Sequence, residues 1–230
     1  MGTDKMKVLG IETSTDQGSV ALLENERLLG EFLWNLPRSH SQKLIPSIES
    51  LLHTLKIELK EIETICVGLG PGSFTGLRVG LSVAKGLAFS LGAKIVGIPS
   101  FDALAWDLKE KDLVCILSDA KRGLLFFGLY KKGKRIGDLK VLSPEEVLSF
   151  LKDTKEITLI GDGAILYRHI FEKEGFTIDP TPAYPRASSI ALLGFKKILL
   201  HGEDNLSSLS PLYLMSPALK EKGGQSPPPL

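Results

Sequence analysis

The strongest chemical signature lies in residues 68–80, GLGPGSFTGLRVG, between an apolar strand-like run and an amphipathic segment. Glycines permit φ > 0 and close approach of other groups, while Pro71 fixes its own φ and biases Gly70 towards an extended conformation. Ser73 or Thr75 can cap the following helix, and such a helix N-terminus can hold an anion. The loop lacks both the Gly-Lys-Ser/Thr of a Walker loop and the Gly-x-Ser-x-Gly of a nucleophile elbow. We therefore expect Ser73 to cap the helix rather than to act as a nucleophile.

Two predicted turns carry a second group of polar side chains. The first turn contains Glu12, Thr13, Ser14 and Asp16, and Asp119 ends a later strand-like run. Carboxylates and hydroxyls in such turns can hold a phosphate or Mg²⁺. The same residue types also form turns for purely conformational reasons. Both interpretations stay open on the sequence alone.

Hydrophobic periodicity and turn formers predict the elements that would position these residues. The first half reads as strands at 7–12, 19–23 and 27–34, a helix at 41–55, a strand at 63–67, a helix at 75–91 and a strand at 94–97. Pro46 removes a backbone donor, so we expect an irregular first turn in the 41–55 helix.

The second half partly repeats this order. It reads as strands at 113–118, 124–130 and 136–141, a helix at 144–151, a strand at 157–160, and helices at 164–174 and 188–200. The repeating unit of the actin, Hsp70 and sugar-kinase superfold consists of three strands, a helix, a strand, a helix and a strand. We therefore predict an α/β protein with two ββ(β)αβα-type subdomains, the second reduced. Their expected bounds are 1–99 and 100–215, followed by a disordered Pro-rich tail at 216–230.

Charge and composition limit the classes of function. The 28 Lys and Arg residues nearly balance the 27 Asp and Glu residues, which leaves a net charge of +1. A domain that grips RNA alone usually carries a basic excess, so this chain is not expected to do so. No apolar run approaches the ~20 residues that span a bilayer, and the start lacks a signal-peptide pattern. We expect a cytoplasmic protein.

The two cysteines and four histidines do not form a metal-binding pattern. Cys66 and Cys115 each lie in an apolar run, which predicts buried free thiols. The histidines show no His-Glu-x-x-His spacing. His40 lies near a predicted helix start, where we expect it to hydrogen-bond the backbone.

Small residues recur along the predicted 75–91 helix. Gly76, Gly80 and Ala84 stand at i, i+4 and i+8, which places them on one face. That face could pack on the sheet of this chain or against a helix of a partner. The spacing does not distinguish the two.

Residues 70–80 and 84–88 closely resemble the TsaB (YeaZ) family, the non-catalytic partners of TsaD in bacterial threonylcarbamoyladenosine synthesis on tRNA. Further matching blocks lie in order at residues 11–15, 40–46, 118–123, 161–164 and 211–214. The resemblance thus covers roughly residues 6–215, and the glycine block is its specific part.

The resemblance implies a scaffold with no catalytic residues, no required cofactor and no metal. It implies a heterodimer with a TsaD-like protein, docking of a TsaE-like ATPase, contact with tRNA only through the complex, and a homodimer when alone. The implied interface uses the two helices of the first subdomain, through Leu44, Ile48, Leu51, Leu55, Gly76, Gly80 and Ala84. TsaD carries a His-x-x-x-His metal motif where this chain has Ser100 and Leu104, and neither residue replaces an imidazole ligand well.

The alternative is a small ATP- and Mg²⁺-dependent kinase or ATPase of the same superfold. Glu12 or Asp16 would act with Asp119 around Mg²⁺, and Gly161 and Gly163 would lie near the adenosine. Short of activity, a vestigial site with weak ATP or ADP affinity would comprise Glu12, Thr13, Ser14, Asp16, Asp119, Gly161 and Gly163.

Overall fold

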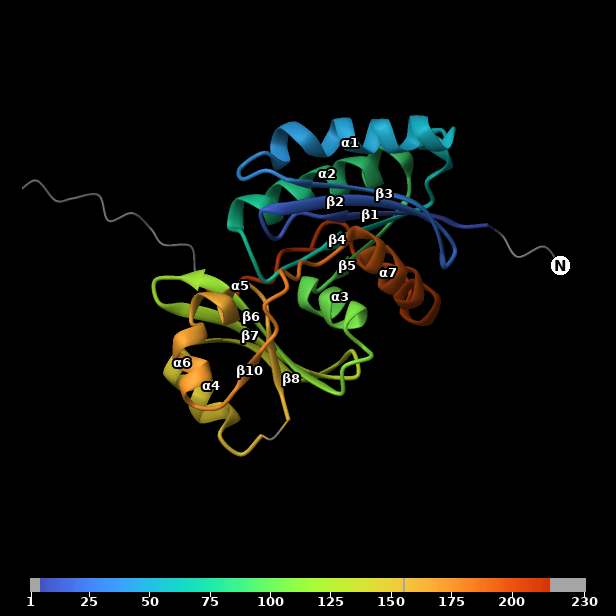
Figure 1. Cartoon of the computed structure of the whole chain (residues 1–230). Helices are drawn as coiled ribbons and strands as arrows, with labels where there is room; N and C mark the ends of the chain where they lie inside the picture. Colours follow the sequence, from blue (N-terminus) through green and yellow to red (C-terminus); the bar gives the residue numbers. More distant parts are fainter. Residues whose placement is uncertain (1–4, 155, 216–230) are drawn as a thin grey trace, which may run out of the picture.

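Two five-stranded sheets organise the chain in the computed structural model, which describes residues 5–154 and 156–215 (Figure 1). The first sheet has the order β3-β2-β1-β4-β5 and the second the order β10-β9-β6-β7-β8. The strands of the first sheet are β1 (Lys7–Glu12), β2 (Gln17–Glu24), β3 (Arg27–Asn35), β4 (Thr64–Gly68) and β5 (Lys94–Ile98). Those of the second are β6 (Leu113–Lys121), β7 (Leu124–Lys131), β8 (Lys134–Leu142), β9 (Thr158–Ile160) and β10 (Thr177–Ile178).

The two sheets share one topology. In the first, β1, β2 and β3 form an antiparallel meander, and β4 and β5 add in parallel beside β1. In the second, β6, β7 and β8 form the meander, and β9 and β10 add in parallel beside β6. The predicted α/β superfold with a repeated unit is confirmed, and the second unit has as many strands as the first.

Two long helices cover one face of the first sheet, and a third helix lies on its opposite face (Figure 1). The first pair is α1 (His40–Leu55) and α2 (Phe74–Leu91), with the short 3₁₀ helix η1 (Leu59–Glu61) between α1 and β4. The third helix is α7 (Ala187–His201), and α3 (Ser100–Asp107) packs between α7 and strands β6 and β8 of the second sheet. On the second sheet, α4 (Pro144–Leu151), α5 (Asp162–Leu166) and α6 (Arg168–Lys173) pack with the core formed around Phe127 and Phe171.

The last helix packs on the first sheet, although it lies within the range 100–215 predicted for the second subdomain. Ile190 and Phe195 of α7 share a core with Val8 and Val96 of the first sheet. Gly10 permits this approach, because a Cβ there would lie 2.2 Å from the Ala187 oxygen. The range 100–215 predicted for the second subdomain therefore includes a helix that packs on the first sheet. The division near residue 99 stays a prediction.

Several local predictions need correction. The helix expected at 164–174 is two short helices, α5 and α6, because the chain breaks at Tyr167 with φ −104° and ψ 23°. Helix α3 was not predicted, and the two residues of β10 are too few to show a periodicity. Helix α1 is continuous through Pro46, and at its start the N–H groups of Gln42 and Lys43 both donate to Ser39 O, at 3.0 and 2.9 Å.

The predicted tail at 216–230 lies outside the described residues. Among residues 5–154 and 156–215, no helix has the length and apolarity needed to cross a membrane.

Candidate functional site

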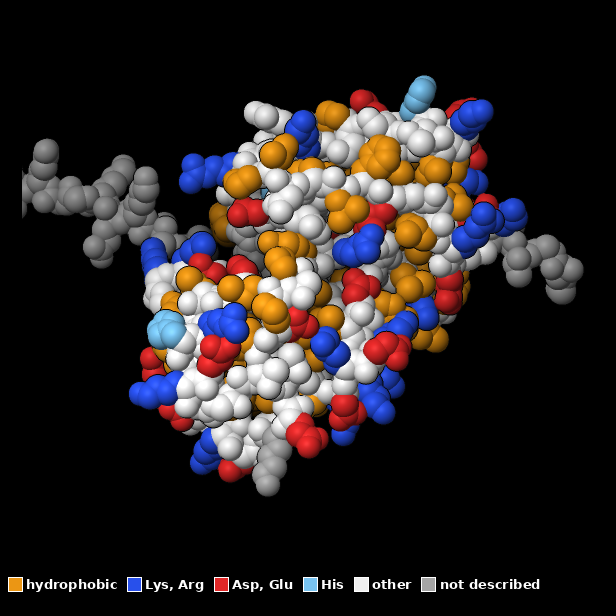
Figure 2. Space-filling model, in the orientation of Figure 1, with side chains coloured by type: hydrophobic (Ala, Val, Ile, Leu, Met, Phe, Trp, Pro, Cys, Tyr) orange, Lys and Arg blue, Asp and Glu red, His pale blue; other side chains and the backbone are white. Residues whose placement is uncertain are grey.

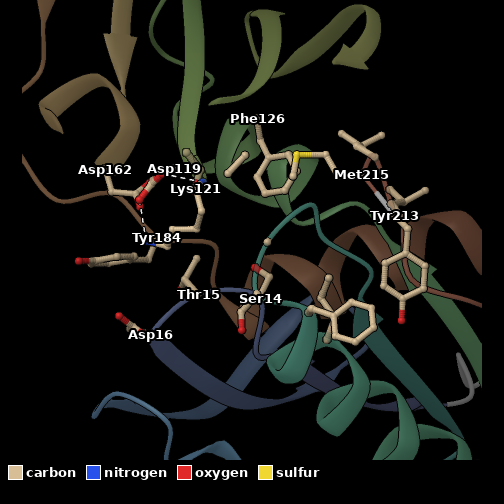
Figure 3. Close-up of a pocket in the computed structure, with 18 of the residues that line it drawn as sticks. Ser14, Thr15, Asp16, Asp119, Lys121, Phe126, Asp162, Tyr184, Tyr213 and Met215 are labelled. Carbon is tan, nitrogen blue, oxygen red and sulfur yellow. Dashed lines mark hydrogen bonds and ion pairs between the residues drawn. The ribbon is translucent and has the colours of Figure 1, made fainter. Parts of the chain in front are cut away.

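A cavity of about 570 Å³ lies between the two halves, where the predicted turns meet (Figure 3). Its walls come from the β1–β2 turn, the start of α2, the β6–β7 hairpin and a segment after α7. The lining residues that carry polar or aromatic groups are Ser14, Thr15, Asp16, Ser73, Phe74, Ser118, Asp119, Lys121, Arg122, Phe126, Asp162, Tyr184 and Tyr213. Three of the seven residues predicted for a vestigial nucleotide site, Ser14, Asp16 and Asp119, line this cavity.

Glu12 is buried at the end of β1 and does not line the cavity. Its carboxylate accepts hydrogen bonds from Ser14 N and from Ser100 Oγ, the latter at 2.7 Å. Burial raises the pKa of Glu12, and the bonds from Ser14 and Ser100 offset this only in part. Gly68 leaves the room for this side chain, since a Cβ there would lie 2.1 Å from Glu12 Oε2. The carboxylate is thus bonded within the chain rather than presented to a ligand.

Asp119 is also engaged by the chain. It accepts from Lys121 N at 2.7 Å and from Lys121 Nζ at 2.6 Å. The bond to Asp119 raises the pKa of Lys121, and the charges of Asp162 and Asp16 add to this effect. One ammonium therefore faces carboxylates from both halves of the protein.

Gly161 and Gly163 serve packing instead of lining the cavity. Gly161 has φ +109°, and a Cβ there would lie 2.3 Å from Leu117 O. A Cβ on Gly163 would lie 2.6 Å from Leu125. These glycines let α5 approach β6, and it is Asp162 between them that reaches the cavity.

The glycine loop before α2 contacts the first turn directly. Ser73 N donates to Ser14 O at 2.7 Å, and a Cβ on Gly72 would lie 2.2 Å from the same oxygen. Ser73 Oγ accepts from Gly76 N at 3.3 Å, which confirms Ser73 as the cap of α2.

The small face of α2 packs on this chain's own first strand. Thr13 Oγ1 donates to Gly76 O at 2.8 Å. A Cβ on Gly76 would lie 2.1 Å from Thr13 O, and one on Gly80 would lie 2.3 Å from Thr13 Oγ1. Ala84 is fully buried in the same core. The three small residues therefore do not lie on an open helix face.

The leucine stripe of α1 faces the same core. Leu44, Ile48 and Leu51 are 1%, 4% and 1% exposed, and Leu55 packs against them. That the two helices carry a partner surface stays a prediction, but the seven residues named for it are corrected: they pack inside this chain. A periodic apolar stripe predicts a buried face without identifying what buries it.

Other predicted residues occupy structural positions. His40 Nε2 donates to Thr15 O at 2.7 Å, and Trp34 Nε1 donates to His40 Nδ1 at 3.2 Å, so the expected backbone contact is confirmed. Cys66 and Cys115 are buried free thiols, as predicted. Ser100, besides its bond to Glu12, accepts from Gly70 N at 3.1 Å.

Sequence reasoning missed the aromatic wall of the cavity. Phe74 packs on Tyr213 with ring centroids 5.2 Å apart, and Arg78 stacks over Phe74 at 3.8 Å. Tyr184 lies on the other side of the cavity (Figure 3). The block at 211–214 was the signal for Tyr213, but its contact with residue 74 depends on the fold.

Charges outside the cavity are mixed. Figure 2 shows basic and acidic side chains interspersed over the face in view, in keeping with the net charge of +1. Among the described residues, no group of three or more His, Cys, Asp or Glu side chains is arranged to hold a metal ion.

Solved structures share this fold. A Pseudomonas aeruginosa protein described as similar to the peptidase YEAZ matches 91% of this chain and 100% of its own, with TM-score 0.80 and 28% identity. The ethanolamine utilization protein EutJ from Carboxydothermus hydrogenoformans matches 81% of this chain and 89% of its own, with TM-score 0.52 and 14% identity, which concerns the fold alone.

Sequence comparisons give the family. The family model for TsaD, tRNA N6-adenosine threonylcarbamoyltransferase, matches residues 35–210. The tRNA threonylcarbamoyladenosine biosynthesis protein TsaB of Bacillus subtilis is 30% identical over 202 residues, 84% of this chain and 88% of its own. TsaB of Haemophilus influenzae is 27% identical over 226 residues, 91% of this chain and 93% of its own. With matching residues along nearly its whole length and the YeaZ fold, the chain belongs to the TsaB (YeaZ) family of tRNA threonylcarbamoyladenosine biosynthesis proteins.

Proposed function

We propose that this chain is a non-catalytic subunit that pairs with a TsaD-like protein for N6-threonylcarbamoyladenosine modification of tRNA position 37. Family membership supports the pathway. The observation that carries the non-catalytic role is the state of the cleft. Glu12 is bonded to Ser14 and Ser100 and does not line the cavity, and Asp119 is bonded to Lys121, so two of the three carboxylates predicted to hold Mg²⁺ are engaged by the chain itself.

The outer side of the α1 and α2 layer is the proposed partner surface. It faces away from the rest of the chain (Figure 1). Ile45 of α1 is 53% exposed and Phe89 of α2 is 80% exposed, whereas the leucine stripe between the helices and the sheet is buried. Large exposed apolar side chains are typical of protein interfaces. A homodimer through this surface when TsaD is absent, and docking of a TsaE-like ATPase on the pair, are part of the same proposal.

Size-exclusion chromatography with light scattering tests the pairing, on this chain alone and mixed with TsaD of the same organism. We expect a 1:1 complex and threonylcarbamoyladenosine formation that needs both proteins. Ile45→Arg should abolish the complex, because it places a charge on the proposed surface. Leu200→Arg is the matched control: Leu200 is 75% exposed, but it lies on α7, on the opposite face of the sheet. A complex that survives Ile45→Arg and Phe89→Arg together would refute this surface.

A nucleotide in the cleft is the second candidate, favoured by the volume of the cavity and by the presence of Ser14, Asp16 and Asp119 in its walls. Calorimetry with ATP and Mg²⁺ distinguishes it. No heat at roughly millimolar ligand, the weak end of the affinity scale, would dismiss this candidate.

A further inference from the structure

The residues after α7 run along both halves of the molecule. We name residues 203–215 the C-terminal strap. In the sequence they follow Gly202, whose φ of +79° turns the chain out of the helix.

The strap begins on the open edge of the first sheet. Asp204 N donates to Ile95 O at 2.9 Å, and Gly97 N donates to Asp204 Oδ2 at 2.8 Å. Lys197 Nζ donates to both carboxylate oxygens of Asp204, at 2.9 and 2.7 Å. Asp204 thus pairs with β5 much as a further strand would.

The middle of the strap is fixed to the first half. Leu206, Leu209 and Leu212 pack against the core under α1 and α2. Lys85 Nζ donates to Ser207 O at 3.2 Å, and Leu212 N donates to Leu69 O at 2.8 Å.

The last residues cross to the second half. Leu214 and Met215 pack against the core that contains Phe101, Phe126 and Tyr130. Three residues of extended chain span at most about 10 Å, so the crossing from Leu212 to Met215 is short. Leu212, Tyr213, Leu214 and Met215 also form one wall of the cavity.

This crossing lies opposite another connection between the halves. The chain passes from the first sheet to the second between β5 and β6 and returns between β10 and α7. Tyr184 belongs to the return connection, and it lies on one side of the cavity while Tyr213 and Met215 lie on the other (Figure 3). Connections on a single side would form a hinge about which the cleft could open.

We propose that the C-terminal strap locks the two halves at one opening, so that the cleft of this protein does not open and close. The last anchor on the first half, Leu212, is two or three residues from the anchors on the second half, Leu214 and Met215. Together they hold the side of the cavity opposite the return connection. The inference does not depend on the proposed partner.

The distance between two spin labels tests the lock. Labels go on cysteines placed at His201 in α7 and Ser149 in α4, which are both exposed and lie on different halves. Cys66 and Cys115 are 0% exposed and do not compete for the label. In the full chain we expect one narrow distance distribution. With Leu214→Ala and Met215→Ala together, we expect an additional population at longer distance.

Leu206→Ala is the matched control, because it removes a leucine of the same strap that packs against the core of the first half. Its distribution should equal that of the unmodified strap. A broad distance distribution in the full chain overturns the proposal. So does a folded double variant that keeps the narrow distribution, and so does equal broadening of the distribution with Leu206→Ala. Met215→Ala alone repeats the comparison should circular dichroism show that the double variant does not fold.

Discussion

Tyr213 Oη accepts a hydrogen bond from Arg78 Nε at 3.1 Å, and the Phe74 ring lies against both side chains. The contact joins two sequence blocks of the TsaB resemblance, 70–80 and 211–214. Arg78 and Tyr213 are 135 residues apart in the sequence. It fixes Tyr213 of the C-terminal strap to the N-terminal part of α2, at the rim of the cavity.

Removing the Tyr213 hydroxyl should cost little stability. Tyr213 is 42% exposed, so Tyr213→Phe loses a hydrogen bond that water can replace, at a cost of at most about 1 kcal/mol. Tyr213→Ala also loses the ring contact with Phe74, which adds about 0.5–1.5 kcal/mol. Urea denaturation measures both. Equal effects of the two variants would show that the ring contact contributes nothing.

Gly80 and Gly86 should respond in opposite directions to alanine. A Cβ on Gly80 meets Thr13 Oγ1 at 2.3 Å, so Gly80→Ala should destabilise the fold by about 1–3 kcal/mol. Gly86 is in the same helix with nothing within 4 Å, so Gly86→Ala should stabilise it by about 0.5–1 kcal/mol. Denaturant unfolding of both variants supplies the measurement.

The same geometry makes Gly80→Arg a poor probe of a partner surface. The side chain would enter the contact between α2 and β1, so loss of pairing would accompany loss of the fold. A stable, wild-type-like Gly80→Arg protein would contradict the close approach between Gly80 and Thr13.

Glu12 should make stability fall as pH rises. Burial raises its pKa above the ordinary value of 4.5, so the folded state binds the proton more tightly than the unfolded state. Its contribution is complete below pH 4.5 and is lost as pH rises through the raised value. The difference in unfolding free energy between wild type and Glu12→Gln should therefore decline across that window. A pH-independent difference would contradict the assigned shift.

The two thiols should be unreactive in the native protein. Burial raises the pKa of both Cys66 and Cys115, and each is 0% exposed, so neither presents a thiolate to a reagent. Ellman's reagent at mildly alkaline pH should label neither thiol until denaturant is added, and both afterwards. Rapid labelling of one thiol without denaturant would indicate local opening of its sheet.

Local sequence signals predicted most strands and the long helices. The glycine loop, the cap at Ser73 and the order of elements in each half follow from backbone preference and periodicity, which act over a few residues. The same signals, together with the ordered blocks of the TsaB resemblance, pointed to the family. They also placed Ser14, Asp16 and Asp119 in turns that meet at the cleft.

Only the tertiary structure determined what covers each apolar face. The stripe of Leu44, Ile48 and Leu51 and the small residues of α2 predicted burial, but hydrophobic burial has no preferred partner, so own core and partner interface look alike in sequence. Helix α7 could have packed on either sheet. At Gly10 and Gly80, a segment distant in the sequence packs directly on the glycine. These contacts, like the crossing of the strap at Leu212–Met215, depend on where distant segments meet, which no local pattern encodes.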